Sequence, residues 1–122
     1  MSFADMLTGI IGRVEGALAA IILGIDGIPI ERCAAGEDQG LDIETIATEF
    51  TTLLRRAMHT AADTDLGELQ EMMLGTGRAL FLLRPITSEY FLMVALAPGG
   101  NVGRARFELR KAQLALEHEF SL

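Results

Sequence analysis

Apolar side chains recur at helical spacing near the start of the chain. Six of them follow the i, i+3, i+4, i+7 pattern of one helix face: Phe3, Met6, Leu7, Ile10, Ile11 and Val14. Ser2 precedes this stripe as a candidate N-cap, and Asp5 stands three residues later, where a capping box places its second polar side chain. We therefore predict an amphipathic helix over residues 2–14, ended by Gly16.

The pattern then changes to that of a β-hairpin. Residues 17–25 are continuously apolar, which is typical of a strand buried on both faces. Asp26 and Gly27 predict a two-residue turn, after which apolar and polar side chains alternate over residues 28–35. Because Pro29 has no N–H to donate to a neighbouring strand, we predict that this returning strand lies at the edge of a sheet.

A second helix is predicted to begin after Asp42, which is a good N-cap residue. An acidic, glycine-flanked loop over residues 36–40 precedes it, and Asp63-Thr64-Asp65 ends it. The apolar positions of this helix cover an arc of about 140°, which is wider than the ~100° needed to cover one core face. The surplus is assigned to the flank formed by Ala47, Thr51 and Met58. We expect this flank to meet a second protein surface.

Three strands are predicted next, over residues 68–74, 78–86 and 89–97. Gly75-Thr76-Gly77 joins the first two of them, and residues 85–88 join the second and third. The second and third strands are largely apolar, so both are predicted to be central in the sheet. The first strand alternates polar and apolar side chains, which indicates an edge position.

The last predicted helix begins after Asn101, a candidate N-cap. Its inward stripe repeats at 3-4-3-4 spacing and consists of Val102, Ala105, Leu109, Ala112 and Leu116. Phe107 and Leu114 lie off this stripe. Residues 1–122 are therefore predicted to form a single α+β domain of order α-β-β-α-β-β-β-α, with a five-stranded antiparallel sheet and helices on both faces.

Charge and composition limit the classes of molecule that this protein is expected to bind. Ten basic and 17 acidic side chains give a net charge of −7, which disfavours nucleic acid and anionic lipid as partners. The longest apolar run, residues 17–23, is far shorter than the ~20 residues of a membrane helix, and the N-terminus lacks a signal-peptide core. The lone Cys33 suits a reducing compartment. We expect a soluble cytoplasmic protein without direct membrane insertion.

Three common motifs of nucleotide-binding and catalytic sites are absent from the sequence. It has no phosphate-binding glycine loop, no His-Glu-x-x-His and no Gly-x-Ser-x-Gly. Cys33 and His59 are the candidates for a thiolate–imidazole pair, but a packed cysteine and a solvated histidine are the simpler interpretation. His59 and His118 lie on separate helices without a carboxylate at ligand spacing, which makes a poor metal site. We expect no catalytic residues, no metal and no cofactor.

Two groups of side chains can each be interpreted in two ways. The first group is a set of cations early in the last helix, where they oppose the helix dipole: Arg104, Arg106, Arg110 and Lys111. They form either a partner or anion site or a solvated face beside an acidic body. The second group, which forms either an adaptable interface or core filling, is Met58, Met72 and Met73.

Three stretches, taken with the order of elements, resemble the Roadblock (dynein light-chain) family. They are Gly-Ile-Asp-Gly-Ile-Pro-Ile at residues 24–30, Asp-Ile-Glu-Thr-Ile-Ala at residues 42–47, and Pro-Gly-Gly-Asn-Val-Gly-Arg-Ala-Arg at residues 98–106. Val102 stands where the family more usually has leucine. The resemblance extends over residues 2–118, and the chain is similar to bacterial or archaeal members.

The resemblance implies a non-enzymatic protein that pairs its second helices and its edge strands into a homodimer. It also implies a platform or regulator for a small Ras-like GTPase. The implied dimer surface consists of Thr51, Leu54, Arg55, Met58, Leu69, Glu71 and Met73. The implied GTPase surface consists of Thr48, Thr52, Arg55 and His59. No position matches a diagnostic arginine finger, and only Arg55 and Arg56 are candidates for that role.

An alternative from a different class is a small-molecule sensor. Profilin-like and PAS-like folds share a five-stranded antiparallel sheet and include ligand-binding domains. This alternative predicts a pocket lined by the apolar face of the sheet and a ligand that raises the melting temperature.

Overall fold

The computed structural model describes residues 2–36 and 40–120. Within these residues, three helices and five strands follow the predicted order. Their bounds are α1 (Phe3–Arg13), β1 (Ala17–Gly24), β2 (Pro29–Ala34), α2 (Ile43–Asp63), β3 (Met72–Gly75), β4 (Leu80–Pro85), β5 (Tyr90–Leu96) and α3 (Val102–Phe120). The predicted α+β class is confirmed. Residues 37–39 of the predicted 36–40 loop lie outside the described residues.

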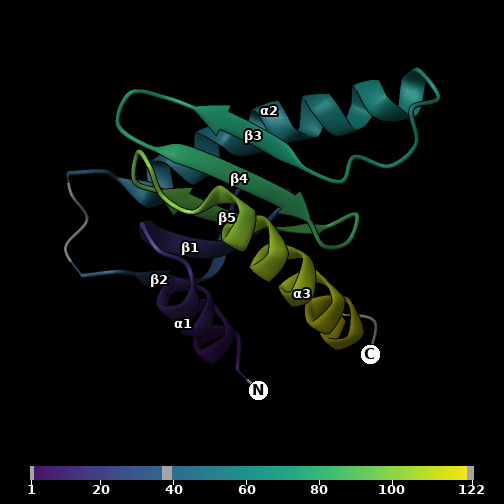
Figure 1. Ribbon diagram of the computed structural model, residues 1–122. Coiled ribbons are helices and arrows are strands. Elements are labelled where there is room, and N and C mark those ends of the chain that lie inside the picture. The colour runs from purple at the N-terminus through teal and green to yellow at the C-terminus, as the bar shows by residue number, and fades with distance from the viewer. Residues whose placement is uncertain (1, 37–39, 121–122) are drawn as a thin grey trace.

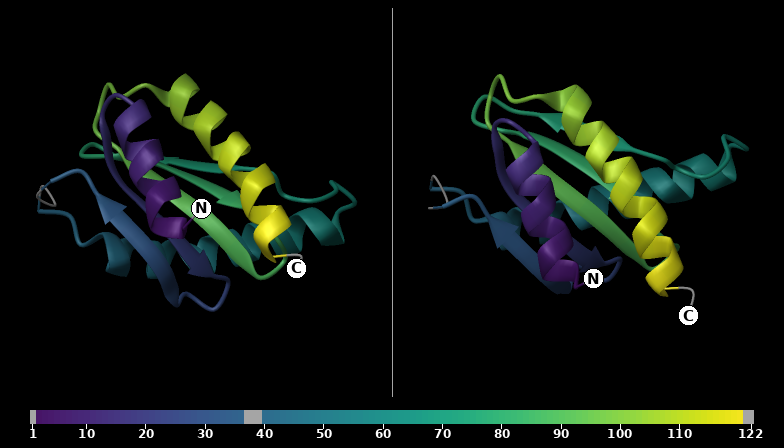
Figure 2. Two further views of the ribbon diagram at one scale, coloured as in Figure 1. Left: turned by 90° about the horizontal axis from the view of Figure 1, so that it is seen from below. Right: turned by 60° about the horizontal axis from the view of Figure 1, so that its bottom comes forward.

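The strands form one antiparallel sheet in the order β2-β1-β5-β4-β3. α2 covers one face of this sheet, and α1 and α3 lie side by side on the other (Figures 1 and 2). The apolar strand β5 is central, as its sequence predicts, with β1 and β4 beside it. β2 and β3 are at the two edges, so the prediction from Pro29 is confirmed.

Three side chains begin the three helices as N-caps. Each accepts a hydrogen bond from the backbone N–H three residues later, at 3.0 Å for Ser2, 3.2 Å for Asp42 and 3.0 Å for Asn101. At Asp42, the hydroxyl and the backbone N–H of Thr45 both donate to the carboxylate, and this lowers its pKa below the ordinary value. All three predicted N-caps are confirmed.

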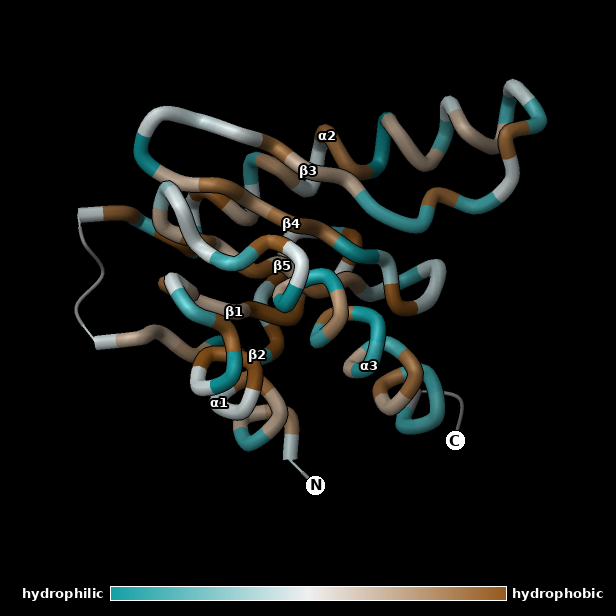
Figure 3. Tube along the Cα trace, viewed as in Figure 1, coloured by the Kyte–Doolittle hydropathy of each residue, from teal (hydrophilic) through white to brown (hydrophobic). Residues whose placement is uncertain are grey.

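The sheet separates two apolar core layers, because successive side chains of a strand point to opposite faces. Leu82, Leu92 and Val94 belong to the layer under α1 and α3. Phe81 and Phe91 belong to the layer under α2. Figure 3 shows the hydrophobic colour along the central strands between the helices. With both layers filled, the faces of α2 and α3 that point away from the sheet are left for interactions.

The turn between β1 and β2 differs from the prediction. The N–H of Gly27 donates to the carbonyl of Gly24 at 2.9 Å, and the N–H of Gly24 donates to the carbonyl of Ile28 at 3.0 Å. These bonds enclose a three-residue loop, so the predicted two-residue turn is wrong. The physical reason is that a turn of this type ends on a residue with positive φ, and Gly27 supplies it at +88°.

The edge strand β3 is shorter than predicted. It begins at Met72, and residues 68–71 have no strand pairing in the structure. In the observed register the next partners along β4 would be Arg84 and Pro85. The N–H of Ile86 points to β5, where it donates to Tyr90, so the Pro85 position faces the β3 side. Since proline has no N–H, the ladder ends there.

Candidate interaction surfaces

Two residues of the expected dimer surface lie in the core. Thr51 is 2% exposed and Leu54 is 0% exposed, because the centre of the apolar arc of α2 points at the sheet. The hydroxyl of Thr51 donates to the carbonyl of Ala47 at 2.8 Å within the helix. The prediction that Thr51 and Leu54 offer side-chain surface to a second chain is therefore wrong. Ala47 is buried in the same way, and Met58 is half-buried against the same core layer.

The apolar surplus of α2 lies on the opposite flank, which we call the α2 flank. It consists of Ile46, Phe50, Leu53 and Ala57, at helical spacing. Phe50 packs edge-on against Phe81 of β4 with the ring centroids 5.1 Å apart, and Leu53 is 44% exposed. The sequence contains this arc, but the rotation of the helix about its axis decides which border of the arc is left uncovered.

The four residues of the expected GTPase surface do lie together. Thr48, Thr52, Arg55 and His59 are all exposed and are spaced along one line of α2. The Thr48 hydroxyl donates to the carbonyl of Gly27 at 3.2 Å. The His59 Nε2 lies 3.0 Å from a carboxylate oxygen of Asp63.

The arginines of α2 differ in their surroundings. Arg55 Nη1 donates to the carbonyl of Ile25 at 3.3 Å, so this arginine, like Thr48, connects α2 to the β1–β2 turn. Arg56 is exposed on the adjacent line of the helix. Of the two arginines considered for a role in GTP hydrolysis, Arg55 thus has a structural contact within its own chain.

The expected dimer residues around β3 do not share one face. Met73 is exposed on the side of α3, opposite Leu82 of β4. Leu69 packs against the core layer under α2. The carboxylate of Glu71 lies 2.8 Å from Arg106 of α3. The predicted alternation fails because residues 68–71 leave the sheet.

A catalytic or metal centre is not assembled from the candidate residues. Cys33 belongs to the core layer under α1, where its Sγ lies 3.5 Å from the hydroxyl of Thr8. His59 is on α2, on the other face of the sheet, so the two candidates do not form a pair. Within residues 2–36 and 40–120, no group of three or more potential ligands is placed to hold a metal ion. No helix in that part of the chain could cross a membrane.

An open hollow of about 1000 Å³ lies beyond the end of β3, between α3, the end of α2 and the β4–β5 turn. Its lining mixes apolar side chains such as Leu69 and Ile86 with Arg84, Gln113 and Glu117. Arg84 donates to Gln113, which donates to Glu117 at 2.8 Å. The sensor alternative predicts a pocket on the apolar sheet faces, but helices cover both of these faces, and the hollow is at the edge.

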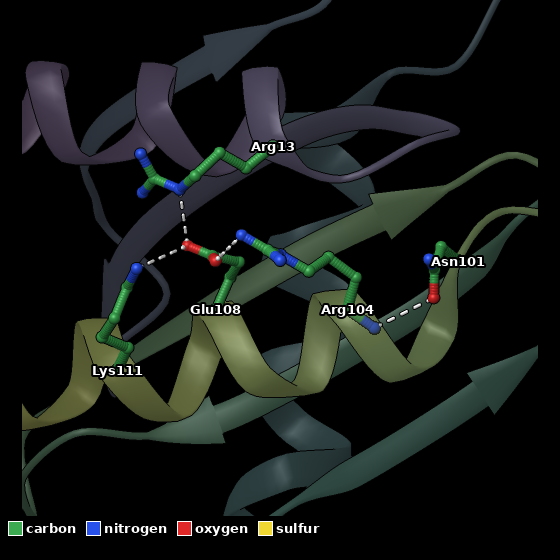
Figure 4. Close-up of polar contacts among 5 residues, drawn as sticks. All are labelled: Arg13, Asn101, Arg104, Glu108 and Lys111. Atoms are coloured by element: carbon green, nitrogen blue, oxygen red, sulfur yellow. Dashed lines mark hydrogen bonds and ion pairs between the residues drawn. The ribbon is translucent and has the colours of Figure 1, made fainter.

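The structure also contains a buried charge that the sequence pattern did not predict. Glu108 of α3 is 1% exposed, and Figure 4 shows three cations around its carboxylate. Arg13 Nε of α1 lies at 2.8 Å, Arg104 Nη2 at 2.9 Å and Lys111 Nζ at 3.4 Å. The contact of Arg104 with Oε2 is an ion pair without a well-aligned hydrogen bond. Within the sequence, this cluster is indicated by the spacing of Arg104 and Lys111, which stand four residues before and three residues after Glu108 and so lie beside it on the helix.

Two of these cations, Arg13 and Lys111, favour the charged form of Glu108. Burial alone would raise the pKa of this carboxyl. The hydrogen bond and charge of Arg13, together with Lys111, outweigh that effect and hold the pKa below its ordinary value. Glu108 is therefore ionised at neutral pH and connects α1 to α3.

No protein-family model matches the sequence, and no curated protein sequence matches it. Among solved structures, the chain is similar to MglC from Myxococcus xanthus, with 31% identity over 98% of this chain and 99% of that one, at a TM-score of 0.70. A Roadblock/LC7 domain from Streptomyces avermitilis has 14% identity over the full length of both chains, at a TM-score of 0.86. An MglB with a tetrameric arrangement has 16% identity over 97% of this chain and 88% of that one, at a TM-score of 0.83. The last two similarities show the fold.

Proposed function

Because this chain belongs to the Roadblock/LC7 domain family, we propose that it is a non-enzymatic regulator or scaffold of a small Ras-like GTPase and that it acts as a homodimer. The observation that carries the proposal is the α2 flank. A helix that already covers its sheet exposes a further apolar border, with Leu53 at its most open point. Such a border on a small domain is typical of an interface.

The edge strand supports the same arrangement. Among the strands that the structure describes, β3 pairs with β4 alone, and its residues Met72 and Leu74 belong to the core layer that also includes Phe50 of the α2 flank. Two chains that place α2 beside α2 and β3 beside β3 would bury this flank and pair both free strand edges. One of the similar structures, an MglB, has a tetrameric arrangement, which is in keeping with self-association.

The proposed GTPase surface is the line of Thr48, Thr52, Arg55 and His59. This line borders the core stripe on the side away from the α2 flank, so a dimer would leave it accessible. Arg55 and Thr48 also contact the β1–β2 turn, so a partner on this surface would touch both elements. We expect any effect on GTP hydrolysis to come from reshaping of the switch loops of the GTPase.

The test is binding of a Ras-like GTPase from the same source, loaded with GDP or with a non-hydrolysable GTP analogue. A preference for the GTP state would identify a nucleotide-sensing regulator, and hydrolysis rates would then distinguish an activator from an effector. Equal affinity for both states would identify a scaffold, since a ligand indifferent to two states shifts neither. Absence of binding in both states would overturn the proposal.

A matched pair of variants locates the surface. Thr52→Arg places a long cation in the middle of the proposed line and should weaken GTPase binding about tenfold or more, an interface effect of ~1.4 kcal/mol. Thr8→Arg makes the same change on α1, on the other face of the sheet, and should leave the affinity unchanged. If the two substitutions had equal effects on the affinity, the GTPase would not bind at this face of α2.

A further inference from the structure

The outward face of α3 exposes two large apolar side chains. Phe107 is 56% exposed and Leu114 is 66% exposed. They are seven residues apart and point away from the buried stripe that includes Leu109 and Leu116. The outward face of a surface helix is normally polar, so these two side chains indicate a face that is built for contact.

Cations surround this apolar pair. The guanidinium of Arg104 lies 5.5 Å from the centre of the Phe107 ring, and the ammonium of Lys111 lies 5.6 Å from it. Both distances are within the range of a cation–π contact, which holds each charge against the ring. Arg110 lies one helical turn from both Phe107 and Leu114, and it has no ion-pair partner among the described residues.

The positive charge of this face is only partly neutralised within the chain. Glu108 offsets one of the three charges on Arg13, Arg104 and Lys111. Arg106 is offset by Glu71. With Arg110, the group formed by Arg13, Glu71 and residues 103–114 keeps a net charge of +3, whereas the whole chain carries −7. Arg104 lies in the first turn of α3, where a cation also opposes the helix dipole.

We propose that this face of α3 docks an acidic segment of a partner protein that also carries apolar side chains. The apolar side chains pack on Phe107 and Leu114, and the carboxylates pair with Arg104, Arg110 and Lys111. The face is on the other side of the sheet from α2 (Figure 2). The protein therefore has room for this partner while the α2 surfaces are occupied.

Charge complementarity selects this partner over others. A nucleic acid or an anionic membrane extends far beyond one helix, and it would bring dense negative charge against a chain of net charge −7. A short acidic segment covers only the basic face. A second copy of the chain is itself acidic, and its proposed dimer surface is on α2 and β3.

The experiment is an NMR titration of the full-length protein with a short synthetic peptide of glutamates with leucines at helical spacing. A matched peptide has glutamine in place of each glutamate. We expect the acidic peptide to shift the backbone amide signals of residues 103–114 at up to millimolar concentration, and the glutamine peptide to bind much more weakly. Binding should be lost in about 1 M salt, where the Debye length falls to ~3 Å.

Three variants assign the contacts. Arg110→Glu and Phe107→Ser change exposed side chains. Each should lower the affinity for the acidic peptide about fivefold or more, as expected for loss of an exposed ion pair or an apolar anchor. The control, Arg56→Glu, makes the same change of charge on α2 and should have no effect. An unperturbed amide spectrum elsewhere shows that each variant is folded.

Three results would overturn the proposal. One is the absence of shifts on α3 at millimolar peptide, and another is equal affinity for the two peptides. The third is co-sedimentation of the protein with vesicles of phosphatidylcholine and phosphatidylglycerol, if the Phe107→Ser variant no longer co-sediments. This face of α3 would then bind a membrane and not an acidic segment of a protein.

Discussion

At the residue scale, Glu108 shows how a charged side chain is accommodated in the core. Its carboxylate is buried, and three cations from two helices surround it. Removing one partner of a buried ion pair is costly because the remaining charges lose their compensation. Here Arg13, Arg104 and Lys111 are each about half exposed, so water can solvate them and the free-energy cost of removing the carboxylate is smaller.

We therefore expect Glu108→Gln to lower the free energy of unfolding by about 1–3 kcal/mol at pH 7. Because the folded-state pKa of Glu108 is lowered, its stabilising effect is complete above the ordinary value of 4.5 and is lost as the pH falls through the folded-state value. Urea unfolding at pH 7 and at pH 3 should show the gap between wild type and variant narrowing in acid. Glu119→Gln, an exposed change on the same helix, is the control, and a gap that does not vary with pH would contradict the interpretation.

Gly16 supports a second prediction at this scale. Its φ is +84°, and a Cβ on it would lie 2.6 Å from the Cα of Gly100 in the turn before α3. We expect Gly16→Ala to cost about 1–3 kcal/mol of stability, because it adds both backbone strain and a clash. Apart from its chain neighbours and the backbone of its own helix, a Cβ on Gly12 in α1 would have no atom of the described residues within 4 Å, so Gly12→Ala should instead stabilise by about 0.5–1 kcal/mol. Thermal unfolding of the two variants measures the difference, and shifts of the same sign would argue against this packing.

At the scale of elements, α2 shows where the sequence pattern stops being sufficient. Its start at Asp42 and its length follow from the N-cap and the apolar spacing. The pattern does not say how an arc wider than one core face is divided between the sheet and the surface. Packing on β4, where Phe50 meets Phe81, buries Thr51 and leaves Leu53 at the uncovered border.

If the α2 flank is the dimer seam, Leu53→Glu should give a monomer. A charge at this exposed position costs little in the single chain but would be buried without a partner in the seam. Light scattering measures the mass, and circular dichroism measures retention of the fold. Thr52→Glu adds the same charge one residue away, outside the flank, and should stay dimeric. A Leu53→Glu protein with unchanged mass would place the seam elsewhere.

At the scale of the whole molecule, the central feature is the two-sided sheet. α2 and the β1–β2 turn form one surface, whereas α1 and α3 form the other (Figure 1). Both core layers are closely packed around β5, so the two surfaces are held at a set distance and orientation by a rigid centre. A scaffold requires such an arrangement, since its partners must not compete for one site.

The expected consequence is independence of the two surfaces. Thr52→Arg should weaken binding of the GTPase and leave binding of the acidic peptide unchanged. Arg110→Glu should weaken binding of the peptide and leave binding of the GTPase unchanged. Isothermal titration of each variant with each partner checks this, and titration of the second partner into the preformed complex measures the coupling. A change of affinity by more than about threefold between the free protein and the complex would show that the surfaces communicate.

Local chemistry determined much of this protein from the sequence alone. Helix starts at Ser2, Asp42 and Asn101, the apolar stripes and the edge position of Pro29 depend on neighbouring residues only, and the structure confirms them. Tertiary structure decided the rest. The rotation of α2, the early end of β3 and the burial of Glu108 depend on contacts between residues far apart in the chain. Spacing shows that a helix has an apolar arc, but only the opposing sheet determines which part of that arc is covered.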